Sequence, residues 1–262
     1  MLNKPVQLTS ANAERFTDQS VVDAYHHRLP YPPEVFDKLL SLIADDPQNV
    51  LDVGTGTGEI ARALAPNVFR VDAVDISAPM IERGQQESNG DHPNLHWLLG
   101  AAETVELVPP YALITGGDSI HWMDWPKLFN RFHKILSPTG YVALIERWEN
   151  SVEWEGDLRG LVRRFSTMQN YEPYDLVEEL TKRGHFELVG AMTTQPVTYS
   201  QSIEDYVQSF HSRASLSKQT MQPEVAAEFD RLLRELVTPH SEAGYLTLQT
   251  IAQIRWGKPL KG

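Results

Sequence analysis

A buried-strand pattern that runs straight into three closely spaced glycines is the feature that most constrains this chain. Residues Asn49–Val53 (NVLDV) are mainly apolar, and Gly54-Thr55-Gly56-Thr57-Gly58 follows at once. A helix is predicted at about residues 59–65, because Pro66 ends the helical pattern. A strand, a glycine turn and a helix in this order predict a βα unit with a ligand at the carboxyl end of its strand.

Alternating apolar and amphipathic stretches continue this pattern. Strands are predicted at 68–74, 94–99, 112–115 and 141–145, with Ser77 capping a helix near Pro79 and a helix at 125–136. Helices at 153–183, 202–214 and 222–238 alternate with late strands at 186–197 and 245–256. The alternation predicts an α/β fold, a doubly wound and mostly parallel sheet with a helical cap.

Three regions are expected. Residues 1–45 form N-terminal lid helices (at 18–29 and 33–44), and residues 46–147 form the ligand-binding βα core. Residues 148–262 add the helical cap segments and the last two strands of the sheet.

Composition narrows the range of partners. The 262 residues carry a formal net charge of -12 with only short basic clusters, so no nucleic acid partner is expected. There is no long apolar run and no signal-peptide pattern, so we expect no membrane contact and a cytoplasmic location. Zero cysteines exclude thiolate chemistry, and the sequence does not determine the oligomeric state.

The glycine turn differs from a dinucleotide site. Its spacing is G-x-G-x-G, and Glu59 stands where G-x-G-x-x-G has its third glycine. A carboxylate there repels a pyrophosphate and suits an ammonium group, as does Asp52 just before the turn. The alternative is that Asp52 and Glu59 only cap the helix and its dipole.

Asp75 ends the second predicted strand. A carboxylate at that position can accept hydrogen bonds from both ribose hydroxyls, in dinucleotide enzymes and elsewhere. Asp75 therefore supports a ligand that contains a nucleoside, but it does not distinguish a dinucleotide from other nucleoside cofactors. The plainer alternative is a residue that only turns the chain at the strand end.

Taken together, these motifs resemble the class I S-adenosylmethionine-dependent methyltransferases. The resemblance rests on LDVGTGTGE at 51–59, VDAVDISAPMI at 71–81, GAAETVEL at 100–107 and ITGGDSIHWMDW at 114–125. It implies a seven-stranded Rossmann-like methyltransferase fold. The segment at 25–32 (YHHRLPYP) and the His121-Trp122 pair are similar to a small-molecule subgroup that includes trans-aconitate methyltransferase-like enzymes.

The resemblance implies the site residues. Gly54, Gly56 and Gly58 line the methionine moiety with Asp52 near its amino group, Asp75 holds the ribose, and Ile76 and Met80 flank the adenine. Ala102 offers its backbone N–H to the adenine; Ala101 stands where many relatives carry aspartate, so Glu103 or a backbone carbonyl takes that contact. The remaining cofactor residues are Tyr25, Arg28, Thr55 and Gly117, and the substrate residues are Tyr31, His121, Trp122 and Trp148.

His121 is the candidate catalytic residue. It follows the fourth strand, where its imidazole can accept a proton or position the substrate. The alternative is that His121 packs the loop while Trp122 closes the pocket. Arg28 either pairs with an acid near the cofactor or binds a substrate carboxylate. No histidine spacing suits a metal, and none is expected.

The sequence thus predicts methyl transfer from S-adenosylmethionine to a small organic molecule, with S-adenosylhomocysteine as product and oxygen preferred over nitrogen or carbon as the methylated atom. Two alternatives remain. One is an NAD-dependent oxidoreductase on a similar sheet, and the other is a catalytically silent module that binds S-adenosylmethionine.

Overall fold

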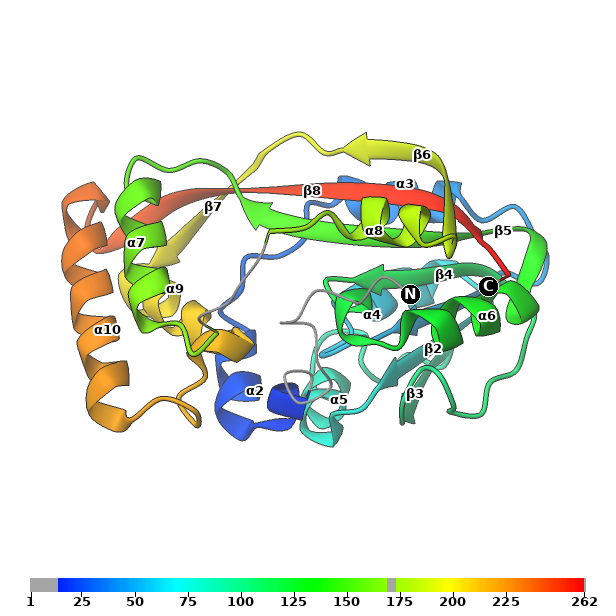
Figure 1. Ribbon diagram of the computed structural model, residues 1–262, viewed down its shortest axis with the longest axis horizontal. Helices are drawn as coiled ribbons and strands as arrows, with labels where there is room; N and C mark the ends of the chain where they lie inside the picture. The colour runs from blue at the N-terminus through cyan, green and yellow to red at the C-terminus, as the bar shows by residue number, and fades with distance from the viewer. Residues whose placement is uncertain (1–13, 169–172, 262) are drawn as a thin grey trace.

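The computed structural model describes residues 14–168 and 173–261 (Figure 1). Residues 1–13 of the expected lid, residues 169–172 of the expected cap and residue 262 lie outside the described residues.

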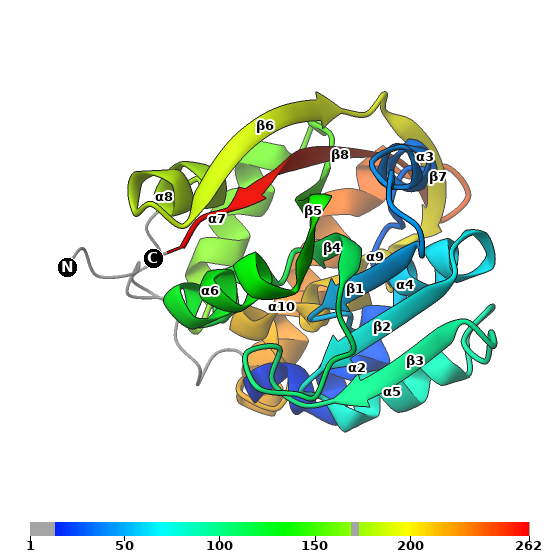
Figure 2. The same ribbon diagram turned by 90° about the vertical axis from the view of Figure 1, so that its right-hand side faces the viewer.

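One mixed sheet organises the molecule (Figure 2). Its order is β3-β2-β1-β4-β5-β8-β6, and β7 also pairs with β8. Strands β1 to β5 pair in parallel, whereas β8 runs antiparallel to β5, β6 and β7. The bounds are β1 Asn49–Val53, β2 Arg70–Asp75, β3 Leu95–Leu99, β4 Tyr111–Gly117, β5 Leu136–Glu149, β6 Phe186–Thr193, β7 Val197–Ser202 and β8 Tyr245–Pro259.

The predicted Rossmann-like, mostly parallel sheet is confirmed, with one difference in strand number. The late strand expected at 186–197 forms as β6 and ends at Thr193, and an additional strand that the sequence did not predict, β7, follows it, so the sheet has eight strands instead of seven. Both strands pair with β8, because β8 is fifteen residues long and offers partners along its whole length.

Alternation along the strands builds two apolar layers. Val50 of β1 faces the cluster made with α3 (Glu34–Ser41) and α4 (Glu59–Leu64). Its neighbour Leu51 faces the opposite cluster, made with α6 (Trp125–Ile135) and α8 (Leu176–Lys182). Successive side chains of a strand point to opposite faces, so each strand of the centre contributes to both layers. Both faces of the sheet are therefore covered, as a parallel sheet requires.

A helical cap stands at one end of the sheet. Helices α7 (Glu155–Phe165), α9 (Ile203–Ser209) and α10 (Pro223–Val237) gather around the start of β8, away from α4 and α6 (Figure 1). Trp154, Tyr206 and Phe229 are buried in their shared apolar cluster. The region expected to be helical at 153–183 contains the two helices α7 and α8. Because β5 continues to Glu149, the boundary expected at 147 falls within a strand.

The N-terminal lid is a short helix, α2 (Gln19–Tyr25), instead of the helix expected over 18–29. Its Val21 and Val22 pack on Met80 of α5 (Ala78–Gln85), and its far end approaches the turn η4 (Phe210–Ser212) of the cap. Single turns η1 (Glu14–Thr17), η2 (Ala65–Asn67), η3 (Ile120–Trp122), η5 (Ala214–Leu216) and η6 (Thr238–His240) complete the elements. Among the described residues, no helix is long and apolar enough to cross a membrane.

Candidate functional site

The glycine turn follows β1 as predicted and is tightly wound. Gly54, Gly56 and Gly58 have φ values of +63°, +57° and +76°, in the left-handed region that favours glycine. A Cβ on Gly58 would lie 2.4 Å from the ring of Trp97, and one on Gly54 would lie 2.5 Å from the Cβ of Ser119. The turn therefore needs glycine both for its backbone and for its close packing.

Asp52 lies buried beneath this turn, with 2% of its surface exposed. It accepts hydrogen bonds from the Thr55 hydroxyl at 2.5 Å and the Thr115 hydroxyl at 2.7 Å. Burial raises the pKa of Asp52 to about 6, although these two hydrogen bonds oppose the shift. A buried carboxylate of this kind favours a cationic group placed beside it.

Asp75 ends β2 beside the same turn. Its two carboxylate oxygens accept from the backbone N–H of Gly56 at 2.7 Å and of Ser77 at 2.8 Å. Burial raises the pKa of Asp75. Each carboxylate oxygen can accept a further hydrogen bond, so the groups already bound leave capacity for ribose hydroxyls.

The carboxylate of Glu59 is balanced by a positive charge that the sequence did not reveal. Arg147 Nη1 lies 2.8 Å from Glu59 Oε2, and the Tyr31 backbone N–H donates to Glu59 Oε1 at 2.6 Å. Burial alone would lower the pKa of Arg147, but Glu59, Tyr31 and Asp118 around it raise the pKa overall. Arg147 thus already neutralises the carboxylate that was expected to suit a ligand's ammonium group, whereas Asp52 has no cationic side chain bonded to it.

Helix α2 closes over the turn. A Cβ on Gly56 would lie 3.5 Å from the Tyr25 hydroxyl, and the cavity lined by Tyr25, Tyr31, Asp52, Thr55 and Gly117 measures about 20 Å³. A space of that size holds about one water molecule. The residues around this turn have the chemistry that S-adenosylmethionine requires.

The residues expected around the adenine take different positions. Ile76 is 42% exposed beside Asp75, whereas Met80 is buried under α2. Ala102 is buried, and its carbonyl accepts from Arg131 at 2.9 Å. Glu103 accepts from the Asp124 backbone N–H at 2.8 Å at the start of α6, and Ala101 lies partly exposed before this turn. These adenine roles stay predictions.

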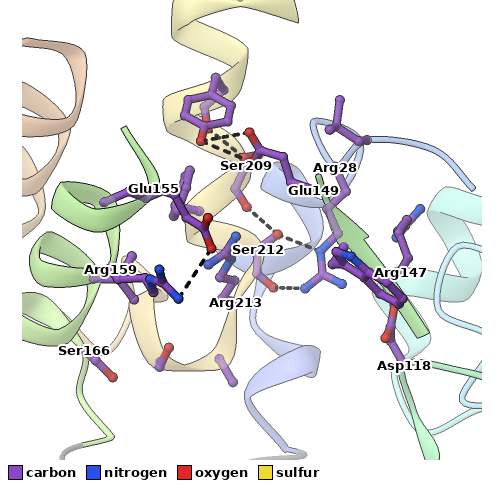
Figure 3. Close-up of a pocket in the computed structure, with 18 of the residues that line it drawn as sticks. Arg28, Asp118, Arg147, Glu149, Glu155, Arg159, Ser166, Ser209, Ser212 and Arg213 are labelled. Atoms are coloured by element: carbon purple, nitrogen blue, oxygen red, sulfur yellow. Dashed lines mark hydrogen bonds and ion pairs between the residues drawn. The ribbon is translucent and has the colours of Figure 1, made fainter. Parts of the chain in front are cut away.

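A second and much larger cavity lies between the cap and the core. Its volume is about 1140 Å³, and it is lined by β5, α7, the turns η4 and η5, and the segment after α2 (Figure 3). The expected residues that line it are Arg28, His121, Trp122 and Trp148. Tyr31, expected to meet substrate, instead lines the small cavity and donates its hydroxyl to Asp118 at 3.2 Å.

His121 and Trp122 reach this cavity from η3, the turn that follows β4. Their rings lie 4.6 Å apart, and Phe16 of η1 contacts Trp122 at 5.8 Å between ring centroids. The indole N–H of Trp122 is buried and has no hydrogen-bond acceptor among residues 14–168 and 173–261. The pair thus lies where the core and cap meet.

The cavity also contains functional candidates that the sequence did not reveal. Glu149 ends β5, and the Tyr206 hydroxyl donates to its carboxylate at 3.2 Å. Burial raises the pKa of Glu149 to about 7. Arg213, between η4 and η5, stacks its guanidinium on the Phe210 ring at 4.3 Å. The strand pattern continues through Trp148, and this signal could have placed Glu149 at the end of the strand. No local sequence pattern indicates a role for Arg213.

Metal binding receives no support from side-chain placement. In the described part of the chain, no group of three or more histidine, aspartate or glutamate side chains is arranged so that it could hold a metal ion.

Comparisons with known proteins agree with this geometry. Residues 25–190 match the family described as a methyltransferase domain. A malonyl-[acyl-carrier protein] O-methyltransferase of Ilyobacter polytropus is 29% identical over 149 residues, 55% of this chain and 54% of that protein. A tRNA 5-carboxymethoxyuridine methyltransferase of Escherichia coli is 30% identical over 114 residues, 42% of this chain and 44% of that protein. The chain spans about half the length of such curated relatives.

Solved structures share the fold. A protein described as a type II methyltransferase from Anaeromyxobacter dehalogenans has a TM-score of 0.65 at 19% identity, covering 88% of this chain and 97% of that one. A Haemonchus contortus N-methyltransferase in complex with S-adenosylhomocysteine has a TM-score of 0.52 at 16% identity, covering 99% of this chain and 61% of that one. With the family match over most of its length, this chain belongs to the class I methyltransferases.

Proposed function

We propose that this protein transfers a methyl group from S-adenosylmethionine to a small organic acceptor held in the large cavity. The observation that carries the proposal is a set of unpaired polar atoms. Four buried side-chain atoms in the described residues lack a hydrogen-bond partner, and three of them line this cavity: Trp122 Nε1, Gln201 Oε1 and Thr250 Oγ1. An unpaired buried polar group costs about 1–3 kcal/mol, which a polar ligand would offset.

The cofactor half of the proposal rests on the glycine turn. Asp52 offers a buried carboxylate to an ammonium group, and Asp75 offers two acceptor oxygens to a ribose. Asp75 fits the ribose of either cofactor, but the buried Asp52 carboxylate beneath the turn does not suit a pyrophosphate, which disfavours the NAD-dependent alternative. The cavity beside His121 and Trp122 disfavours a silent binding module, because it leaves room for an acceptor.

When bound, S-adenosylmethionine supplies a methyl group on a sulfonium, which is already a strong electrophile. The residues of this chain therefore have mainly to align an acceptor and exclude water. His121 and Glu149 both line the cavity and can each accept a proton from an acceptor that must lose one. Tyr206 holds the Glu149 carboxylate in place through its hydroxyl.

Oxygen is the preferred methylated atom, with a carboxylate as one option. The relative from Ilyobacter polytropus is by name an O-methyltransferase, which supports this preference. The tRNA-modifying relative raises a nucleic acid as an acceptor. The net charge of -12 disfavours that acceptor, because nucleic acid affinity comes mainly from cationic contacts to phosphates.

The test measures cofactor binding and methyl transfer separately. Calorimetry with S-adenosylmethionine, S-adenosylhomocysteine and NAD is expected to detect the first two only. Release of S-adenosylhomocysteine is then measured across carboxylic acids, phenols and amines, with tRNA as a further arm. The proposal is wrong if NAD binds and S-adenosylmethionine does not, or if tRNA alone is methylated. His121→Ala and Glu149→Gln assayed over a range of pH identify which group accepts a proton.

A further inference from the structure

The large cavity differs in charge from the chain that surrounds it. The whole chain has a net charge of -12, yet five arginines and three acidic residues line the cavity. The arginines are Arg28, Arg147, Arg159, Arg163 and Arg213, and the acidic residues are Asp118, Glu149 and Glu155. An acidic protein thus presents a net positive wall at the place where the proposed acceptor binds.

Two of these arginines are already neutralised. Arg147 pairs with Glu59 at 2.8 Å, and Arg159 lies 3.5 Å from Glu155. The paired carboxylates offset these two charges, which leaves less positive charge for a ligand.

Arg28 and Arg213 form no close ion pair with a carboxylate among the described residues, although Asp118 attracts Arg28 and Glu149 attracts Arg213 at longer range. Arg28 donates to the Ser212 hydroxyl at 2.8 Å and the Ser212 carbonyl at 2.9 Å, which fixes the direction of its guanidinium. Arg213 packs one face of its guanidinium on the Phe210 ring and lines the cavity. Figure 3 shows the two side chains on either side of Ser212.

The two guanidinium groups also repel each other. Burial and the positive charge of Arg28 lower the pKa of Arg213, and the attraction of Tyr206 and Glu149 offsets only part of that shift. Holding like charges together inside a cavity costs free energy, and an anion between them removes that cost. Guanidinium groups match the paired oxygens of a carboxylate or phosphate and bind them with charge-assisted hydrogen bonds.

We propose that Arg213 and Arg28 bind an anionic oxygen group of the methyl acceptor, either a carboxylate or a phosphate. This inference deepens the proposed function and rests on it for the identity of the ligand as an acceptor. The two arginines are specificity residues, since they select acceptors by charge. His121 and Trp122 line the same cavity, from the turn after β4.

The experiment is equilibrium binding by calorimetry, with no cofactor present. The probes are succinate, inorganic phosphate and the neutral analogue succinamide. The parent protein is expected to bind succinate or phosphate and not succinamide. The anion that binds more tightly shows whether the site prefers a carboxylate or a phosphate. Arg213→Met is expected to weaken that binding about tenfold or more, the usual loss for charge-assisted hydrogen bonds.

Two further variants make the result specific. Arg164 lies on helix α7 outside the cavity, and 64% of its side chain is exposed. Arg164→Met removes one positive charge, as Arg213→Met does, but it is expected to change the affinity for the anion less than about twofold. Arg213→Lys keeps the charge and loses the planar fork, so an intermediate affinity is expected; if Arg213→Met does not fold, the comparison of Arg213→Lys with the parent is the test.

The inference is wrong if neither anion binds the parent better than succinamide, or if the Arg213 variants bind the anions as tightly as Arg164→Met does. Calorimetry with S-adenosylmethionine on the same variants separates this failure from failure of the proposed function. A protein that still binds S-adenosylmethionine and methylates neutral acceptors keeps that function and loses only the anion site.

Discussion

The Gly58→Ala substitution tests whether the glycine turn is as tightly wound as the structure shows. Gly58 has a φ of +76°, and a left-handed conformation costs a residue with a Cβ roughly 1–2 kcal/mol. The new Cβ would also lie 2.4 Å from the Trp97 ring, and overpacking of this kind costs roughly a further 1–3 kcal/mol. We therefore expect a loss of about 2–5 kcal/mol in the free energy of unfolding. Urea denaturation with linear extrapolation measures it.

Gly184→Ala is the matched control for this substitution. Gly184 has nearly the same φ, +73°, but no atom lies within 4 Å of the position that its Cβ would take. It should lose only the conformational part, about 1–2 kcal/mol. An equal loss in both variants, with equal denaturant slopes, would show that Trp97 does not pack against the turn and would refute the reasoning.

Three further predictions concern titration and the cofactor. Asp75→Ala should weaken S-adenosylmethionine binding by on the order of 1–3 kcal/mol through lost hydrogen bonds to the ribose, and unchanged calorimetric affinity would count against that role. Because burial raises the pKa of Asp52 to about 6, S-adenosylmethionine affinity should fall up to tenfold per pH unit below that value, and Asp52→Asn should remove this dependence. Glu149 has its pKa raised from 4.5 to about 7, so the folded state binds its proton more tightly and the stability from this group is lost as pH rises through that window. Glutamine does not titrate, so the free energy of unfolding of Glu149→Gln should rise relative to that of the parent by up to about 3 kcal/mol between pH 4 and pH 8. If denaturation experiments give the same difference in free energy at every pH, the pKa of Glu149 is not raised.

Local signals made the cofactor half of the fold predictable. The strand Asn49–Val53 has the predicted bounds, because an apolar run closed by glycine is a signal within a few residues. Ser77 caps α5 as predicted, with its hydroxyl accepting from the Met80 backbone N–H at 3.3 Å. Such elements depend on neighbours in the chain, so their residues alone reveal them.

The cavity was not predictable, because distant segments assemble it. The strand expected to end at residue 145 runs on to Glu149, since β8 pairs with it as far as Glu149 and Thr250. That pairing brings Trp148 and Glu149 to the cavity wall, and Arg213 arrives from a turn between two cap elements. The pairing of two strands that lie about a hundred residues apart cannot be predicted from the sequence of either strand alone.

The partner of Glu59 was missed for the same reason. The role of Glu59, at the start of helix α4, was predicted from its neighbours in the sequence. Its partner Arg147 lies on the distant strand β5. Charge at a site is a property of the folded arrangement, and a count of nearby acidic residues in the chain misses every distant cation. Asp52 differs, because its partners are the hydroxyls of Thr55 and Thr115, which leave its charge unbalanced.

Helix α2 connects the two halves of the site. Tyr25 at its end lies over Gly56 of the glycine turn, and Arg28 just beyond it donates to Ser212 of the cap. The Arg28 guanidinium also lies 4.3 Å from the centre of the Tyr25 ring, so the two side chains pack as one unit. Any shift of α2 that opens the small cavity above the turn must therefore also move Arg28 in the large one. If the proposed function is right, the cofactor site and the acceptor cavity are coupled through this segment, which the sequence analysis expected only to act as a lid.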